Sequence, residues 1–183
     1  MRRSAFVFFL VCFVYAAAAR SGCAQAVESA DRPGMRVVAG GMASVFNSND
    51  QNDYLIGGGA FLDVHLSHWV QLEGEARFLR WNQYLGEQQD NYLIGPRVPL
   101  MHLGRKGQIY GKALIGYGRM TFPAGYGYGS FTALAFGETV EFRMSRRLTF
   151  RALDFEYQDW PKWVNNTSLY PFGVSVGVGY RVH

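Results

Sequence analysis

The segment 170–183 reads YPFGVSVGVGYRVH and carries the clearest structural signal in the chain. Along it, large apolar side chains alternate without interruption with small or polar ones. The apolar set is Tyr170, Phe172, Val174, Val176, Val178, Tyr180 and Val182. In an extended strand, successive side chains point to opposite faces, which gives a period of two. The segment is therefore predicted to be a β-strand with one apolar face and one face of small or polar groups.

The same period of two recurs throughout the preceding sequence, whereas no long segment shows the apolar spacing of an amphipathic helix. The pattern predicts eight strands, over residues 35–46, 54–65, 69–81, 90–100, 108–119, 131–143, 148–159 and 170–183. Two strands break the pattern, because Glu138 falls among the apolar residues of the sixth and Arg151 among those of the seventh. We expect a β-bulge or a misjudged local parity at each of these positions.

The connections between the predicted strands alternate in length. Short connections are expected near 66–68, 101–107 and 144–147, and longer ones near 47–53, 82–89, 120–130 and 160–169. This alternation describes an antiparallel meander with all of its long loops at one end. An eight-stranded meander closes most naturally into a barrel, which leaves no exposed sheet edge. The predicted fold is therefore all-β, an eight-stranded antiparallel up-and-down barrel over residues 35–183.

The start of the chain has the features of an export signal. Arg2 and Arg3 precede an uninterrupted apolar run, which is followed by small residues. Ala24 and Ala26 then form a typical small-residue cleavage motif. We therefore expect residues 1–26 to be a signal peptide that is cleaved after Ala26.

Residues 27–34 would then be a short lead to the barrel. Two alternatives to the cleaved signal remain. An uncleaved membrane anchor is disfavoured because the apolar run is shorter than the roughly 20 residues that span a bilayer. A lipoprotein modified at Cys23 is disfavoured because Arg20 stands three positions before it, where an apolar residue is expected.

Removal of the signal changes the composition of the chain. The full sequence has 18 Lys and Arg against 14 Asp and Glu, and loss of residues 1–26 leaves 15 against 14. Both cysteines, Cys12 and Cys23, lie in the same segment. The mature chain therefore has no basic excess to suggest nucleic-acid binding, and no thiol for a disulfide, thiolate catalysis or a Cys-ligated metal.

Alternation alone does not say which face points inward. A soluble lipocalin-like barrel would enclose a ligand with the apolar face, whereas a membrane barrel turns that face toward lipid. The predicted strands approach the length of about 9–11 residues that a tilted membrane strand needs. Aromatic residues also gather near strand ends, with Trp81, Tyr92 and Trp160 near the long loops and Trp69 and Tyr180 near the short turns. These features favour a membrane barrel, with a soluble periplasmic binding barrel as the alternative.

The predicted signal, the eight strands and the run 177–182 (GVGYRV) resemble the small bacterial outer-membrane β-barrel proteins, the group that contains the OmpA transmembrane domain, OmpX and the opacity proteins. The resemblance covers residues 35–183. It implies a monomer in the bacterial outer membrane, in contact with membrane lipid and lipopolysaccharide. It also implies that the barrel-assembly machinery recognises the last strand, at positions Tyr170, Phe172, Tyr180 and Val182. The family's chains commonly end in an aromatic residue, whereas Val182 and His183 stand at the corresponding place here.

In the membrane orientation, a set of ionisable side chains faces the lumen. The predicted set is Asp63, Glu73, Glu75, Arg77, Arg97, Lys112, Glu141, Arg143, Asp154 and Glu156. An eight-stranded barrel has an interior only wide enough to be filled by side chains. We therefore expect a salt-bridge network that fills the lumen and fixes the strand register, with a gated, charge-lined channel as the alternative.

No catalytic residue, metal site or cofactor is predicted. His65, His68, His102 and His183 all fall near the short-turn end of the predicted barrel, far from the outer leaflet. Lipid-modifying barrels of this size use a His at the outer leaflet as the general base. The predicted function is therefore non-enzymatic, either structural in the envelope or adhesin-like through the long loops, and a lipid A-modifying enzyme is the third possibility.

Overall fold

The structure, a computed structural model, describes residues 36–49, 54–83, 85–161 and 167–182. The expected signal peptide, its cleavage site at Ala24 and Ala26, and the lead 27–34 lie outside the described residues.

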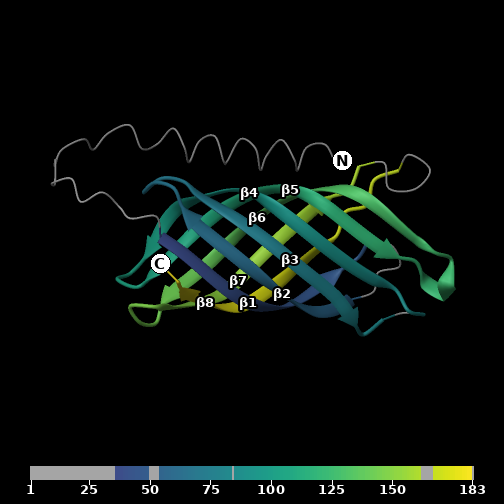
Figure 1. Ribbon diagram of the computed structural model, residues 1–183, viewed down its shortest axis with the longest axis horizontal. Coiled ribbons are helices and arrows are strands. Elements are labelled where there is room, and N and C mark those ends of the chain that lie inside the picture. Colours follow the sequence, from purple (N-terminus) through teal and green to yellow (C-terminus); the bar gives the residue numbers. More distant parts are fainter. Residues whose placement is uncertain (1–35, 50–53, 84, 162–166, 183) are drawn as a thin grey trace. The chain divides into compact units, whose positions relative to one another are not determined.

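Eight strands make up the described part of the chain. They are β1 (Arg36–Asn47), β2 (Tyr54–His65), β3 (Gln71–Trp81), β4 (Gln88–Leu103), β5 (Gly107–Thr121), β6 (Tyr128–Arg143), β7 (Leu148–Asp159) and β8 (Phe172–Arg181). Each strand pairs with the next, and the antiparallel pairing of β8 with β1 closes the barrel (Figure 1). The predicted fold class is confirmed.

The strands β4, β5 and β6 are longer than predicted. Thr121 pairs with Tyr128, so the strands take up five of the eleven residues expected in the long loop at 120–130, and residues 122–127 connect them as a hairpin. Its turn is a short 3₁₀ helix, η1 (Pro123–Gly125), followed by Gly127 at a φ of 115°. Glycine is the residue that adopts such a positive φ without strain. No helix among the described residues is long and apolar enough to span a membrane.

A bulge on β7 explains the position of Arg151. Arg151 pairs with Gly177 of β8, but the next pair along the two strands joins Asp154 to Ser175, so β7 carries one more residue than β8 over this interval. The extra residue reverses the side-chain parity and turns Arg151 into the lumen, where it is fully buried. The expectation at Glu138 was wrong, because its pairing with Gly111 and Phe155 is regular and its side chain is exposed on the outer face.

The two faces of the wall have opposite polarity. On β8, Val174, Val176 and Val178 point outward and are 41%, 48% and 53% exposed, whereas Ser175 on the other face is buried. The buried face also carries most of the charged strand residues. This polarity is the reverse of that in a lipocalin-like barrel and is the arrangement expected in lipid.

Inward-facing glycines let the strands approach one another closely. A Cβ on Gly57 would lie 1.9 Å from the carbonyl oxygen of Phe78, and one on Gly116 would lie 1.9 Å from that of Tyr92. Any larger residue would push the neighbouring strand away. These glycines therefore help to keep the barrel narrow.

Apolar side chains fill the lumen near the long loops. Phe46, Leu55, Leu79 and Met120 are fully buried there, as is Trp160, whose indole nitrogen donates to Gln158 Oε1 at 2.7 Å. Trp160 was expected in the outer aromatic girdle, which was wrong because its side chain points inward. The charged part of the lumen is thus closed off on the long-loop side.

Candidate functional site

The charged side chains of the lumen form one buried group, which we call the lumenal charge cluster. Five strands, β2 to β6, and the bulged strand β7 contribute to it, and each member is at most 9% exposed. Its members are Asp63, Glu73, Glu75, Arg77, Arg97, Lys112, Glu141, Arg151, Asp154 and Glu156. A buried charge is costly unless it is paired, so the contacts within the cluster determine what it can do.

Arg77 joins opposite walls of the barrel. Its Nη1 donates to Oε1 of Glu156 on β7 at 2.8 Å, and its Nη2 donates to Oε2 of Glu75 on its own strand at 2.8 Å. Glu156 also accepts from Gln158 Nε2 at 2.6 Å. Because β3 and β7 are not neighbours in the sheet, the bond between Arg77 and Glu156 crosses the lumen and ties two strands that the backbone ladder does not connect.

Lys112 of β5 lies among four carboxylates, the most distant of which is Glu73 at 3.7 Å. Its Nζ is 2.9 Å from Asp154 Oδ1 and 3.0 Å from Glu156 Oε2, and it also forms an ion pair with Glu75. Thr139 Oγ1 donates to Asp154 Oδ1 at 3.0 Å. The ammonium group therefore links β3, β5 and β7 through the centre of the barrel.

Arg97 and Arg151 share their acidic partners. Arg97 Nη1 donates to Asp63 Oδ2 at 2.8 Å, and its Nη2 lies 2.6 Å from Glu141 Oε1. Arg151 Nη1 donates to Glu73 Oε1 at 2.7 Å, and Arg151 also contacts Asp63 at 3.1 Å and Glu141 at 3.2 Å. This shared set joins β2, β3, β4, β6 and β7.

Aromatic rings cover the guanidinium planes of the cluster. Arg151 lies 3.7 Å from the centroid of Phe61, and Arg97 lies 3.8 Å from that of Tyr110. Arg77 lies 4.3 Å from the ring of Phe46. Stacking on a ring face stabilises a cation that has lost its water. The aromatic side chains and the ion-paired side chains together fill the charged part of the lumen.

One group of carboxylates within the cluster has the spacing of a metal site. One oxygen each of Glu73, Glu75 and Asp154 lies within 4.8 Å of the others. Lys112 contacts Glu75 and Asp154, however, and Arg151 lies 2.7 Å from Glu73. Two protein cations already balance these carboxylates, so ion pairing accounts for their proximity.

The structure brings together nine of the ten residues that the sequence assigned to the lumen. The tenth, Arg143, lies outside the cluster at the end of β6, where its side chain is exposed. Arg151 was missed as a member, although the break in alternation at this position was the signal that could have identified it.

The other sequence-derived positions are distributed over the two ends of the barrel. Phe172 and Tyr180 of β8 face outward, Tyr170 precedes the strand and stacks on Tyr157, and Val182 is 65% exposed. His65 ends β2, His68 lies in the next turn, and His102 lies near the end of β4, all at the short-turn end. His183 lies outside the described residues.

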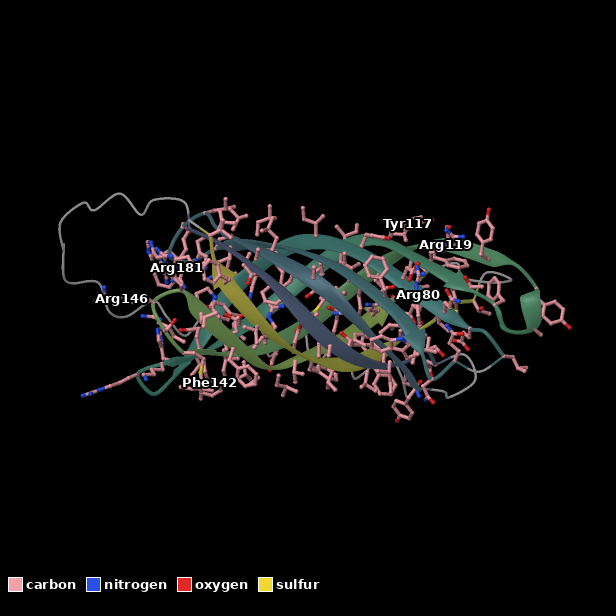
Figure 2. All side chains as sticks on the ribbon, turned by 60° about the horizontal axis from the view of Figure 1, so that its bottom comes forward. Arg80, Tyr117, Arg119, Phe142, Arg146 and Arg181 are labelled. Carbon is pink, nitrogen blue, oxygen red and sulfur yellow. The ribbon has the colours of Figure 1, made fainter. Side chains whose placement is uncertain are left out.

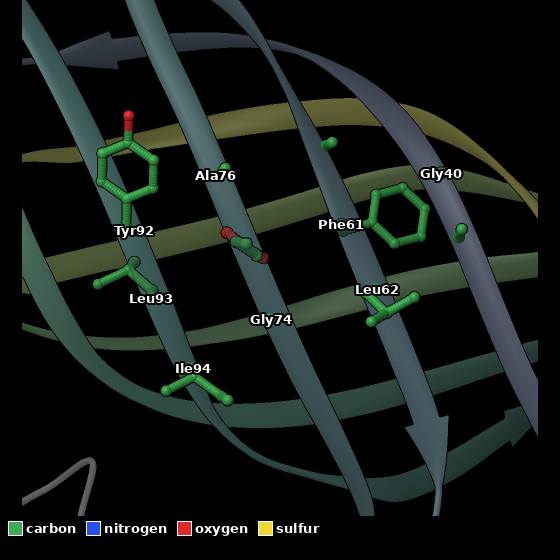
Figure 3. Close-up of a pocket in the computed structure, with 11 residues that line it drawn as sticks. Gly40, Phe61, Leu62, Gly74, Ala76, Tyr92, Leu93 and Ile94 are labelled. Carbon is green, nitrogen blue, oxygen red and sulfur yellow. The ribbon is translucent and has the colours of Figure 1, made fainter.

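A hollow of about 570 Å³ lies on the wall formed by β1 to β4. Leu62, Tyr92 and Ile94 surround a stretch where Gly74 and Ala76 leave little side-chain bulk (Figure 3). A Cβ on Gly74 would meet nothing within 4 Å. The hollow comes from small residues on the outer surface of the wall, so it is a feature of the lipid-facing side.

The long-loop end carries charges on its outer surface. Arg80 Nη2 forms a salt bridge with Asp90 at 2.8 Å, and Arg119 lies 4.3 Å from the ring of Tyr128. Figure 2 shows Arg80, Tyr117 and Arg119 at this end and Arg146 and Arg181 at the other.

The chain thus combines a closed barrel, an apolar outer face and a buried charged lumen. A family model described as "Outer membrane protein beta-barrel domain" matches residues 7–181. The chain belongs to this family. A comparison with curated protein sequences gives no match.

Solved structures give the same fold. Neisserial surface protein A (NspA) superimposes with a TM-score of 0.60 at 12% identity, over 80% of this chain and 96% of that one. The N-terminal β-barrel domain of Pseudomonas aeruginosa OprF superimposes with a TM-score of 0.54 at 11% identity, over 80% of this chain and 96% of that one. At such identities the likeness shows the fold alone, and that fold agrees with the family.

Proposed function

We propose that the protein is a monomeric, non-enzymatic barrel of the outer membrane that seals its own lumen and presents its long loops at the cell surface. The observation that carries the proposal is the lumenal charge cluster, in which every cation contacts at least two carboxylates inside the barrel. A lumen filled in this way supports the wall from inside and leaves no wide aqueous path. Porin-like diffusion of nutrients does not fit this geometry.

The route to the membrane is part of the proposal. Residues 1–26 would direct export and be cleaved after Ala26, and the barrel-assembly machinery would insert the chain through its last strand. Outer-membrane lipid and lipopolysaccharide would then surround the apolar wall. Nucleic acid is not among the partners that we propose.

The first experiment tests membrane insertion. Cells expressing the full chain are fractionated, and the outer-membrane fraction is run on detergent gels with and without boiling. We expect the protein in that fraction and a different mobility before and after boiling, because a folded barrel resists detergent until heated. A soluble periplasmic protein without a mobility difference would contradict the proposal.

The second experiment tests the sealed lumen. Purified barrels are reconstituted into planar bilayers and into sugar-loaded vesicles. We expect no steady conductance of porin size and no swelling from sugar entry, both for the wild type and for the control Arg143→Ala, whose side chain lies outside the cluster. Steady large conductance of the wild type would overturn the structural role of the cluster and favour the channel alternative.

A surface-interaction role rests on a different observation. The hairpin between β5 and β6 presents Tyr126 and Tyr128, which are 88% and 69% exposed, beyond the wall. Large exposed aromatics on a hairpin held by the barrel are suited to contacting another surface. Cells displaying Tyr126→Ser/Tyr128→Ser should adhere less well to host cells or to one another than wild-type cells do. The matched control is Leu66→Ser, in the turn at the other end, and equal adhesion of all three would argue against this role.

Enzymatic activity is not proposed. His65, His68 and His102, the histidines in the described part of the chain, lie at the short-turn end. The purified barrel is therefore expected to leave lipid A unchanged, as read by mass spectrometry of the lipid after incubation. Removal or transfer of an acyl chain would favour the enzyme alternative.

A further inference from the structure

The short-turn end of the barrel carries a ring of positive charge, which we call the basic rim. The contributing segments are the start of β1, the β4–β5 turn, the end of β6, the β6–β7 turn and the end of β8. Its members are Arg36, Arg105, Lys106, Arg143, Arg146, Arg147 and Arg181. Figure 2 shows Arg146 and Arg181 at this end, away from Arg80 and Arg119.

The cations of the basic rim lack ion-pair partners among the described residues. None of its seven members forms a salt bridge with an Asp or Glu in residues 36–49, 54–83, 85–161 and 167–182. The Nε atoms of Arg36 and Arg181 are buried and have no hydrogen-bond partner within these residues. Buried donors of this kind normally find an acceptor, so these two point to an acceptor beyond the described residues.

Part of the basic rim lines an open hollow of about 380 Å³. Its lining consists of five cationic residues with one Met and one Ser, and contains no carboxylate: Arg105, Lys106, Arg143, Met144, Ser145, Arg146 and Arg181. A backbone hydrogen bond of 2.8 Å from Arg143 N to Lys106 O holds two of the contributing segments together. The positive charges are therefore gathered around one space by the fold of the backbone.

The basic rim lies beside the outward aromatic residues of the same end. Phe142 precedes Arg143, Tyr180 precedes Arg181, and Arg147 Nη1 donates to the Tyr180 hydroxyl at 3.1 Å. Tyr180 and Phe150 face outward and are 45% and 39% exposed. Aromatic side chains of this kind sit at headgroup level in membrane barrels, and short turns lie on the periplasmic side. We therefore place the basic rim at the headgroups of the inner leaflet. This placement rests on the proposed function, a barrel in the outer membrane.

We propose that the basic rim binds the phosphate groups of anionic phospholipids in the inner leaflet, with the 380 Å³ hollow as the main headgroup site. The guanidinium group offers paired N–H donors that match phosphate oxygens in charge and geometry. Acyl chains of the bound lipid would lie along the apolar wall above the rim. Such binding would supply the negative charge that the described residues do not place there.

The test uses the mature barrel, refolded in neutral detergent micelles, with phosphatidylglycerol as the probe. Native mass spectrometry measures the dissociation constant of phosphatidylglycerol from the wild-type barrel and from the variant Arg143→Gln/Arg146→Gln. The matched control, Arg80→Gln/Arg119→Gln, removes the same two charges at the long-loop end. We expect binding about thirty-fold weaker for the rim variant, from the usual contribution of two basic residues near an anionic lipid surface, and little change for the control.

Three results would overturn the proposal: equal affinity of the wild type and the rim variant, an equal loss in the control, or phosphatidylglycerol binding no better than phosphatidylcholine. Displacement of the lipid by millimolar inorganic phosphate would identify free phosphate as the ligand and would also overturn it. The same samples are run unboiled on detergent gels. A folded wild-type barrel without a lipid preference counts against the basic rim alone, whereas the absence of a folded form counts against the proposed membrane barrel.

Discussion

The lumenal charge cluster and the basic rim use the same side chains in opposite ways. Arg151, in the cluster, is fully buried and contacts several carboxylates within 3.4 Å. Arg143 and Arg146, in the rim, are exposed and form no salt bridge with a described acid. In the filled lumen the chain supplies the counter-charge itself, because bulk solvent does not reach these side chains. At the rim, the counter-charge can come from the surroundings.

This difference separates two contributions of positive charge. Cations in the cluster hold the barrel together, whereas cations in the rim are free to recognise something else. Stability measurements should therefore distinguish the two regions, and the variants below are arranged from the largest expected effect to the smallest.

Removal of Arg151 should have the largest effect. In Arg151→Ala, Glu73, Asp63 and Glu141 lose a shared partner inside the lumen. Loss of one partner of a buried ion pair costs about 3–5 kcal/mol, because the remaining charges stay buried. Urea unfolding of the barrel in lipid vesicles measures the free energy of unfolding. Arg143→Ala is the matched control, and similar unfolding of the two variants would contradict the distinction between cluster and rim.

The bond between Arg77 and Glu156 allows a test of whether the two side chains stabilise the barrel through their contact with each other. Arg77→Ala leaves Glu156 and Glu75 without their Arg77 bonds, and Glu156→Ala leaves Arg77 with only one carboxylate at 2.8 Å. The double variant should lose less stability than the sum of the single variants, by about 1–3 kcal/mol, because no unpaired member of that bond remains. A double-mutant cycle from the same unfolding curves measures this difference. Additive losses would mean that the two groups act independently.

The alternation of residues predicts the fold and most of the cluster for a simple reason. The outer face of a membrane barrel must be apolar because it contacts lipid, and the inner face must fit a narrow lumen. The odd or even position of a residue along its strand therefore assigns almost every side chain to one face. Arg143 shows the limit of that reasoning. It has the same parity as Glu141, but it lies two residues further along β6, where the strand leaves the lumen. Parity gives the face of a residue and not its depth.

Arg151 and Trp160 show the second limit. A single extra residue in β7 reverses the parity before Asp154, and its place depends on the pairing with β8, which the sequence of β7 alone does not contain. Trp160 resembles a girdle residue because it is aromatic and lies near the end of a strand. It has the parity of Glu156 and Gln158, however, and its side chain fills part of the lumen. Partner strands and depth therefore had to come from the structure.

Glu138 offers a third environment for a charge, on the outer wall. Its side chain faces outward from the middle of β6, between Gly111 and Phe155 of the neighbouring strands. An acidic residue on the lipid face of a barrel is destabilising, although less so than a basic one. Glu138→Leu should therefore raise the free energy of unfolding in vesicles by about 1 kcal/mol. Glu138→Gln is the control that removes the charge and keeps the shape. A loss of stability in the Leu variant would indicate a polar partner for Glu138 in the membrane.

The rim variant Arg143→Gln/Arg146→Gln should show the smallest effect on stability. Both side chains are exposed and neither has a side-chain partner among the described residues, so nothing inside the barrel is left unpaired. In vesicles of phosphatidylcholine alone, the free energy of unfolding should stay within about 0.5 kcal/mol of the wild-type value. In vesicles that contain phosphatidylglycerol, the wild type should gain stability that the variant does not gain, because a ligand that binds only the folded state stabilises it. A large loss of stability in the phosphatidylcholine vesicles would instead mean that these arginines stabilise the barrel. The contrast between the lumenal charge cluster and the basic rim would then be wrong.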